Sequence, residues 1–318
     1  MTNDPLKPFI ICEVGSNWTN YDDCVQSIKE AATTGAHAVK FQLFSHKELY
    51  GLPGPQMVGE LPRHWVNLLA RECDKAGIEF MCSAFSAEGL SFVDPYVKRH
   101  KIASSCITDK KILNAAYRKQ KPVYLSTGAS SLDEIKTAMN IVGSKAMPLY
   151  CVASYPAKVI DLRCIRTMSA ALHCDVGFSD HSTDALVVPR MAVQMGAVVI
   201  EKHYSAIKAD TPDAGHSINT EQFKLMIQSI EGTLPEPRIG WTKEEQDMVL
   251  KHRSRCIVTS PIKEGQSFIL DFNFGIYRSK VEDTKGLHGF SASGINGSIA
   301  ARSLAPGDSI GPNDIRQR

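Results

Sequence analysis

Two apolar segments of this sequence each end on a histidine. "VGFSDHST" at 176–183 contains His181, and "VVIEKHYS" at 198–205 contains His203, with one helix-length stretch between them. Imidazole nitrogens are good ligands for divalent cations, and two histidines on adjacent strand ends can bind the same ion. Two protein ligands leave coordination positions open for water or substrate, as a Lewis-acid catalyst requires. We therefore predict a catalytic metal site, with Asp180 and Asp213 as carboxylates that either take part in catalysis or hydrogen-bond the metal ligands.

Charged and hydroxyl side chains also occur at the ends of the other apolar segments. Glu13, Lys40 and Lys101 carry full charges, and burying a charge without a partner costs several kcal/mol. An anionic ligand, a bound metal or mutual pairing must therefore balance them. The alternation of side chains along a strand places Lys40 and Gln42 on one face. The polar residues at these segment ends are Glu13, Lys40, Gln42, Ser83, Lys101, Ser104, Ser126, Tyr155, Ser179, His181, Glu201 and His203.

These residues fall on a regular alternation of strand-like and helix-like segments. Short runs rich in β-branched and aromatic residues are separated by longer segments with apolar residues at every third or fourth position. Over about 230 residues this pattern predicts a (β/α)₈ TIM barrel, an α/β fold whose active sites lie at the C-terminal ends of the strands. The predicted strands are 9–15, 38–44, 78–85, 100–105, 122–128, 147–153, 175–180 and 198–205.

The rhythm changes after the last of these strands. Two prolines, a glycine and many charges over 233–255 indicate a linker, which leaves the barrel over 1–232. Short strands and turns follow over 256–318, and there "PIKEGQSFILDFNF" is echoed by "SLAPGDSIGPNDIR". In both copies an apolar residue, Ile262 or Leu304, precedes a glycine by three positions. We expect 256–318 to be a small β-rich domain that needs a partner surface for stability.

Composition excludes several classes of function. The 36 basic and 34 acidic residues give a formal charge of +2, which offers no field for nucleic acid or a membrane surface. The nine cysteines form an odd set without a CxxC pair, and no apolar run is long enough to span a membrane. The sequence also lacks GxGxxG after the first strand and a phosphate-binding GxxxxGK motif. We expect a cytoplasmic enzyme without nucleic-acid or membrane partners.

The motifs together resemble the sialic acid synthases, the phosphoenolpyruvate-dependent N-acetylneuraminate and nonulosonate synthases. The resemblance covers nearly the whole chain and follows the family's order of motifs. The matching segments are "CEVGSNW", "AVKFQLF", "HKIASS", "LSTGASSLDEI", "CVASYP", "GFSDHST", "IEKHYS" and "TPDAGHS". The C-terminal segment with its two glycine turns is similar to the antifreeze-like domain (SAF, a β-clip) that ends these enzymes.

The resemblance implies a condensation of phosphoenolpyruvate with an N-acylated mannose-type aldose, such as N-acetylmannosamine, to give a sialic-type acid and phosphate. His181 and His203 would bind Mn²⁺ or Mg²⁺, which polarises the sugar aldehyde. The implied phosphoenolpyruvate-binding residues are Lys40, Ser83, Lys101, Ser104, Ser126 and Ser179. The implied sugar-binding residues are Glu13, Gln42, Tyr155, Asp213 and Arg278.

The resemblance also assigns catalytic roles and a partner. The implied catalytic residues are Glu13, Lys40, His181, His203 and Asp213. Glu13 is the candidate for proton transfer and for orienting the water that attacks C2 of phosphoenolpyruvate. Arg278, in "IYRS", matches an arginine that the family's C-terminal domain places over the active site of the other subunit. A domain-swapped homodimer is therefore implied.

Departures from the family pattern leave the sugar open. Trp18 replaces a histidine, and Ala153 stands where a polar residue is often found. Trp18 either re-lines the sugar pocket or packs beneath a loop. The alternatives are the same reaction on a legionaminic or pseudaminic acid precursor or on mannose, a sugar-binding paralogue without turnover, and a metal-dependent aldolase that uses pyruvate. The retained glutamate, lysines and histidines argue against loss of turnover.

Overall fold

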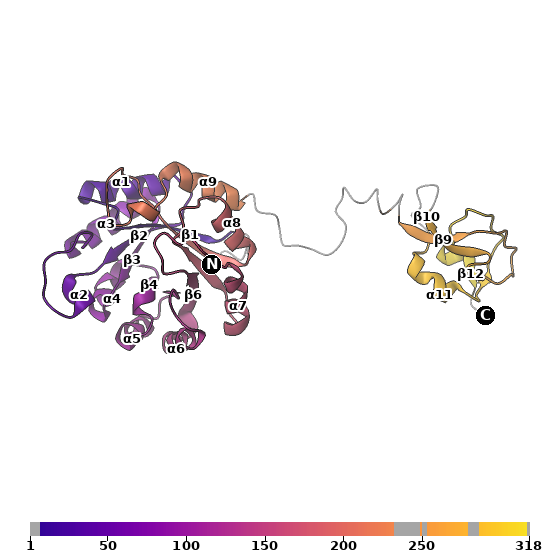
Figure 1. Cartoon of the computed structure of the whole chain (residues 1–318), viewed down its shortest axis with the longest axis horizontal. Helices are drawn as coiled ribbons and strands as arrows, with labels where there is room; N and C mark the ends of the chain where they lie inside the picture. The colour runs from indigo at the N-terminus through magenta and orange to yellow at the C-terminus, as the bar shows by residue number, and fades with distance from the viewer. Residues whose placement is uncertain (1–6, 232–248, 250–252, 279–285, 317–318) are drawn as a thin grey trace. The chain divides into compact units, whose positions relative to one another are not determined.

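The structure is a computed structural model that describes residues 7–231, 249, 253–278 and 286–316. The chain divides into two compact units, Met1–Pro235 and Glu236–Arg318 (Figure 1). Most of the linker predicted over 233–255 lies outside the described residues.

Eight parallel strands close into a barrel in the first unit, which confirms the predicted (β/α)₈ fold. Strands that follow one another in sequence are neighbours in the barrel, and β8 pairs with β1 to close it. The strands are β1 (Phe9–Gly15), β2 (Ala38–Leu43), β3 (Glu79–Ala84), β4 (His100–Ile102), β5 (Val123–Ser126), β6 (Ala146–Cys151), β7 (Val176–Asp180) and β8 (Ala197–His203).

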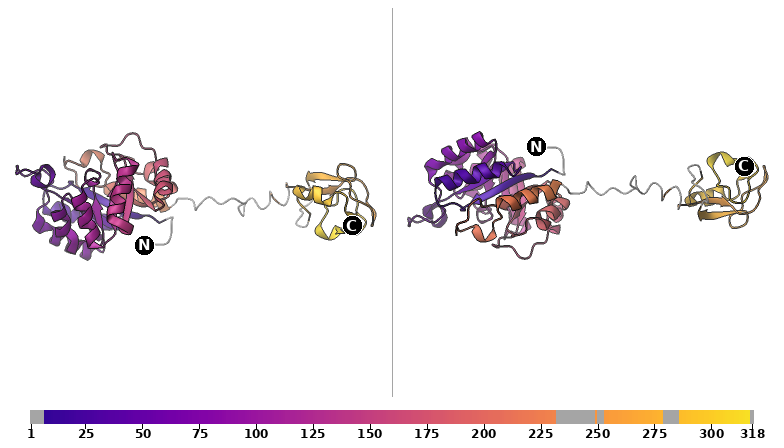
Figure 2. Two further views of the ribbon diagram at one scale, coloured as in Figure 1. Left: turned by 90° about the horizontal axis from the view of Figure 1, so that it is seen from below. Right: turned by 90° about the horizontal axis from the view of Figure 1, so that it is seen from above.

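Helices cover the outside of the barrel (Figure 1, Figure 2). The one over Leu132–Val142 begins at a capping box, in which the Ser131 hydroxyl accepts from the Glu134 amide and the Glu134 carboxylate accepts from the Ser131 amide. The helices are α1 (Tyr21–Ala32), α2 (His46–Tyr50), α3 (Arg63–Ala76), α4 (Ala87–Val93), α5 (Lys110–Lys119), α6 (Leu132–Val142), α7 (Arg163–Leu172), α8 (Val187–Gln194) and α9 (Thr220–Glu231).

Inside the barrel, an apolar layer precedes the polar cavity residues by two positions along the strands. This buried layer consists of Ile11, Ala38, Met81, Tyr124, Leu149 and Val199. Side chains alternate along a strand, so the residue two positions further on points into the barrel again. Those next residues are Glu13, Lys40, Ser83, Ser126, Cys151 and Glu201. Strand register then sets Glu13 beside Lys40 on one side and His203 on the other.

The second unit is small and β-rich, and it fits an antifreeze-like domain. Its strands and helix are β9 (Ser254–Val258), β10 (Phe274–Arg278), α11 (Ala292–Ile295), β11 (Ile299–Ala300) and β12 (Ile315–Arg316). The two sequence repeats pair with each other, because Ile262 and Leu304 exchange two backbone hydrogen bonds of 3.0 and 2.8 Å. Gly265 and Gly307, both at positive φ, make the matching turns of the two copies.

The described part of the chain contains no helix that combines the length and apolar character needed to cross a membrane. All nine cysteines are free thiols.

Candidate active site

A cavity of about 530 Å³ opens at the C-terminal ends of the barrel strands. It gathers nearly every side chain that the sequence predicted for the site. The predicted residues that line it are Glu13, Lys40, Gln42, Ser83, Lys101, Ser104, Ser126, Tyr155, Ser179, His181, His203 and Asp213. Arg278 lies exposed at the end of β10 in the second unit, so its predicted role across subunits stays a prediction.

The cavity also contains residues for which no role was predicted. Glu201 and His216 are the two with chemistry to offer, and both are buried. Glu201 points into the barrel because it lies two positions before His203 on β8. Trp18 packs elsewhere: its indole is buried against Trp65, with ring centroids 5.5 Å apart, and Nε1 donates to the Gly15 carbonyl.

Two lysines and two glutamates form a buried network on the floor of the cavity. Lys40 Nζ lies 2.5 Å from Glu13 Oε2 and 3.6 Å from Glu201 Oε2, and it donates to Ser83 Oγ at 3.1 Å. Lys101 Nζ lies 3.2 Å from Glu201 Oε1. Ser179 Oγ, Lys101 and Lys40 therefore converge on one carboxylate. Mutual pairing, one of the possibilities open from the sequence, balances these charges when no ligand is present.

The two carboxylates in this network have opposite protonation behaviour. Burial raises the pKa of Glu13 to about 7, although the Lys40 ammonium opposes the shift. Burial also disfavours ionisation of Glu201, but Lys101 and Lys40 outweigh it and lower its pKa to about 2. Glu201 therefore stays ionised near neutral pH, whereas Glu13 can gain or lose a proton there.

His181 is held with one ring nitrogen available to the cavity. Its Nδ1 lies 2.8 Å from the Val152 carbonyl oxygen, which can only accept, so Nδ1 carries the proton and Nε2 keeps its lone pair. Burial lowers the pKa of His181 to about 4 and that of His203 well below its usual value. Both rings are therefore neutral at pH 7, the form that binds a metal. The Tyr155 ring stacks on His181 at a centroid distance of 4.3 Å.

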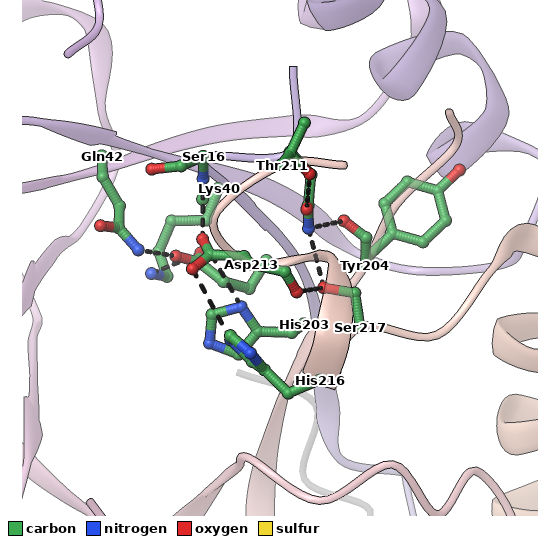
Figure 3. A network of polar contacts seen from close by, with 12 residues as sticks. Ser16, Lys40, Gln42, His203, Tyr204, Thr211, Asp213, His216 and Ser217 are labelled. Atoms are coloured by element: carbon green, nitrogen blue, oxygen red, sulfur yellow. Dashed lines mark hydrogen bonds and ion pairs between the residues drawn. The ribbon is translucent and has the colours of Figure 1, made fainter. Parts of the chain in front are cut away.

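Asp213 lies between two imidazoles at the edge of the cavity. Its Oδ2 accepts from the Ser16 amide at 2.8 Å and is 3.9 Å from Nδ1 of His203 (Figure 3). Its Oδ1 is 3.6 Å from Nε2 of His216. Gly15, at φ +56, allows this approach, because a Cβ there would lie 2.2 Å from Asp213 Oδ2.

A second group of hydrogen bonds fixes the segment after β8 that carries Asp213 and His216. Asn17 Nδ2 donates to the Tyr204 carbonyl at 3.0 Å and to Ser217 Oγ at 2.7 Å. Thr211 Oγ1 donates to Asn17 Oδ1 at 2.7 Å. One buried asparagine from the end of β1 therefore holds both ends of this segment over the barrel mouth.

The donor set fits a divalent cation. Ligand atoms of His203, Asp213 and His216 lie within 4.8 Å of one another. Nδ1 of His203 and Nε2 of His216 are buried, and neither has a hydrogen-bond partner among the described residues. The rings of His181 and His203, the predicted pair, have centroids 5.5 Å apart. Buried imidazoles and a carboxylate around a cavity are groups that could hold Mn²⁺ or a similar ion.

Comparisons with known proteins show similarity along most of the chain. The model of the NeuB family matches residues 56–234. N,N'-diacetyllegionaminic acid synthase of Legionella pneumophila is 32% identical over 70% of this chain and 71% of its own length. Pseudaminic acid synthase of Campylobacter jejuni is 29% identical over 99% of this chain and 98% of its own. The solved structure of N-acetylneuraminic acid synthetase from Leptospira borgpetersenii, in complex with citrate, matches with a TM-score of 0.72 and 29% identity over 78% of this chain and 94% of its own.

Proposed function

The chain belongs to the NeuB family of sialic-type acid synthases, and on that premise we propose that it condenses phosphoenolpyruvate with an N-acylated mannose-type aldose. The products are a nonulosonic acid and inorganic phosphate. One observation carries the proposal: a single cavity at the barrel mouth brings together two lysines, a row of hydroxyls, a carboxylate that titrates near neutrality and several neutral imidazoles. These groups match an anionic phosphate ester beside an aldehyde.

Phosphoenolpyruvate would bind on the lysine side of the cavity. Its phosphate and carboxylate need cations and hydroxyl donors, which Lys40, Lys101 and the lining serines offer. Ser126 Oγ supports this assignment, because it is buried without a hydrogen-bond partner among the described residues. Binding would draw the two ammonium groups partly away from Glu13 and Glu201. The phosphate and carboxylate of the ligand would then take the place of these glutamates as partners of the lysines.

The sugar would lie on the opposite side, near Tyr155 and Asp213. A divalent cation held by His181 and His203 would act as a Lewis acid on the sugar aldehyde. In the reaction, C3 of phosphoenolpyruvate forms a bond to the aldehyde carbon, water adds to C2, and the bond between C2 and the phosphate oxygen breaks to leave a C2 carbonyl. Of the two protons of that water, one ends on the new sugar hydroxyl and the other on the released phosphate. Glu13 takes the proton of the attacking water, because its pKa near 7 allows it to act as a base. Gln42 Nε2 orients this carboxylate by donating to Oε1 at 2.8 Å.

The relatives support a second candidate for the acceptor sugar. The synthases of diacetyllegionaminic and pseudaminic acid, at 32% and 29% sequence identity, are about as similar to this chain as the sialic acid synthetase of Leptospira borgpetersenii, at 29%. A diacetamido precursor of one of these acids is therefore the alternative to N-acetylmannosamine. Mannose is a third candidate, and a sugar-binding protein without turnover is the non-catalytic alternative.

The test is a screen of acceptors with the purified full chain, Mn²⁺ and phosphoenolpyruvate. N-acetylmannosamine, its 6-phosphate, mannose and diacetamido hexoses are added one at a time, and inorganic phosphate is measured. We expect phosphate release only with a suitable aldose, in equal amount to the sugar acid formed. If the chain is folded and binds metal but no acceptor leads to phosphate release, the non-catalytic alternative would be favoured.

A further inference from the structure

The proposed function assigns the metal to His181 and His203 and gives no role to a third buried imidazole in the same cavity. We propose that His216 is a ligand of the divalent metal in this chain, together with His203 and Asp213. The inference rests on the proposed function for the presence of a metal. It deepens that function by adding two ligands, His216 and Asp213, to the predicted histidine pair and, through His216, a preference among metals.

The three side chains come from two adjoining parts of the fold. His203 is the last residue of β8, and His216 ends a short 3₁₀ turn, Ala214–His216, that begins directly after Asp213. Figure 3 shows both rings directed toward the Asp213 carboxylate. Their ligand atoms lie within 4.8 Å of one another. Asp213 Oδ2 is 3.9 Å from Nδ1 of His203 and Asp213 Oδ1 is 3.6 Å from Nε2 of His216. Small rotations of these side chains would bring all three to the bond length of about 2.1 Å from one ion.

A purely structural role does not account for His216. Its Nε2 is 3.6 Å from Asp213 Oδ1, which is too long for a hydrogen bond. The same nitrogen is buried and has no hydrogen-bond partner among the described residues, and Nδ1 of His203 shares this property. The rings of His203 and His216 meet edge to face at a centroid distance of 4.3 Å. A cation between them would satisfy two orphaned nitrogens and the carboxylate at once.

The chemistry of these ligands indicates which cation. His181, His203 and His216 together offer three imidazoles beside the Asp213 carboxylate, and such a ligand set suits Mn²⁺, Co²⁺, Fe²⁺ or Zn²⁺. Mg²⁺ prefers oxygen ligands and keeps most of its water, so it gains little from a third imidazole. His216 should therefore bias the site toward Mn²⁺ and its neighbours and away from Mg²⁺.

The test measures metal binding rather than turnover. The full chain is freed of metal with a chelator, and Mn²⁺ is titrated while free Mn²⁺ is followed by electron paramagnetic resonance. We expect His216→Ala to weaken Mn²⁺ binding at least about tenfold, since even groups behind a ligand contribute that much. Mg²⁺ should displace Mn²⁺ from the variant at a lower excess than from the wild type. The nitrogen coupling in the spin-echo spectrum of bound Mn²⁺ should also decrease.

Two further variants make the result decisive. His64 is exposed on α3, outside the cavity, and His64→Ala should leave Mn²⁺ binding unchanged. If His216→Ala does not fold by circular dichroism, His216→Gln keeps the side-chain volume and should show the same loss. Unchanged affinity and unchanged nitrogen coupling in a folded His216 variant would overturn the assignment, as would a wild type that binds no Mn²⁺. Wild type that binds Mn²⁺ through His216 but releases no phosphate would refute the proposed function alone.

Discussion

Glu13 is the residue whose protonation state governs the proposed reaction. Burial raises its pKa to about 7, so the carboxylate needed as a base is present mainly above that pH. We expect the rate of phosphate release to rise as pH increases through about 7. Glu13→Gln should lower the rate about 10²–10⁴-fold and remove this rise. The measurement is kcat/KM for phosphoenolpyruvate between pH 5 and pH 9, and a rise that persists in the variant would contradict the assignment.

The same pKa has an effect on stability that needs no substrate. The folded state binds the Glu13 proton more tightly than the unfolded chain, where the carboxyl has its ordinary pKa of 4.5. The stabilising contribution of this proton is complete below pH 4.5 and is lost as pH rises through about 7. Relative to Glu13→Gln, the wild type should thus lose unfolding free energy between these values. Urea unfolding of both proteins at pH 5 and pH 8 measures the difference.

The sequence predicted the residues on the strands better than those after them. Lys40, Ser83 and Ser179 were found because a polar residue stands out in an apolar strand and alternation gives its face. His216 was missed because it lies in an irregular segment, "TPDAGHS", where spacing says nothing about direction. Hydrogen bonds from distant parts of the chain, such as those of Asn17 to Tyr204 and Ser217, bring it over the barrel mouth. For the same reason, the sequence could not decide whether Trp18 re-lines the sugar pocket or packs beneath a loop.

The ends of β7 and β8 are joined by an ion pair on the side away from the cavity. Lys202 Nζ lies 2.8 Å from Asp180 Oδ2, both side chains are fully buried, and the ammonium also contacts the Ser182 hydroxyl and carbonyl. Asp180 directly precedes His181, and Lys202 directly precedes His203. The pair therefore sets the distance between the two strand ends that carry the predicted metal ligands.

Removing one partner of this pair should be costly. Lys202→Met leaves the Asp180 charge buried and unpaired, and we expect a loss of about 3–5 kcal/mol in unfolding free energy. Lys75→Met is the matched control, because Lys75 forms an exposed ion pair with Glu72 at 2.7 Å and should lose only about 0–1 kcal/mol. Chemical denaturation measures both. Equal losses in the two variants would show that the buried pair does not hold the strand ends.

Among the secondary-structure elements, the sequence predicted which strands exist better than it predicted where each element begins and ends. All eight predicted strands are confirmed, since short apolar runs bounded by turns are typical of a parallel barrel. The fourth ends at Ile102 rather than at 105, because Ser104–Cys106 turn into a 3₁₀ helix. The helix between β7 and β8 begins only at Val187, because the Asp184 carboxylate accepts from the amides of residues 186 to 188 and caps it there. Such side-chain caps are not visible in periodicity.

At the level of the whole molecule, the chain joins a catalytic barrel to a small unit with internal symmetry. The sequence repeat was a weak signal, yet the paired Ile262 and Leu304 account for it: each copy supplies one strand edge to the other. The role of Arg278 in a second copy depends on an assembly of two chains, and a single sequence gives no contact between chains. It therefore stays a prediction from the resemblance.

In the proposed reaction, water attacks C2 of phosphoenolpyruvate in this cavity, and the C–O bond, not the P–O bond, breaks. The most direct measurement follows the oxygen that bridges C2 and phosphorus. Phosphoenolpyruvate labelled with ¹⁸O at that position is turned over with Mn²⁺ and the acceptor found in the screen, and both products are analysed by mass spectrometry. We expect the label in the released phosphate and solvent oxygen at C2 of the sugar acid. Label retained in the sugar acid would show that the P–O bond breaks instead.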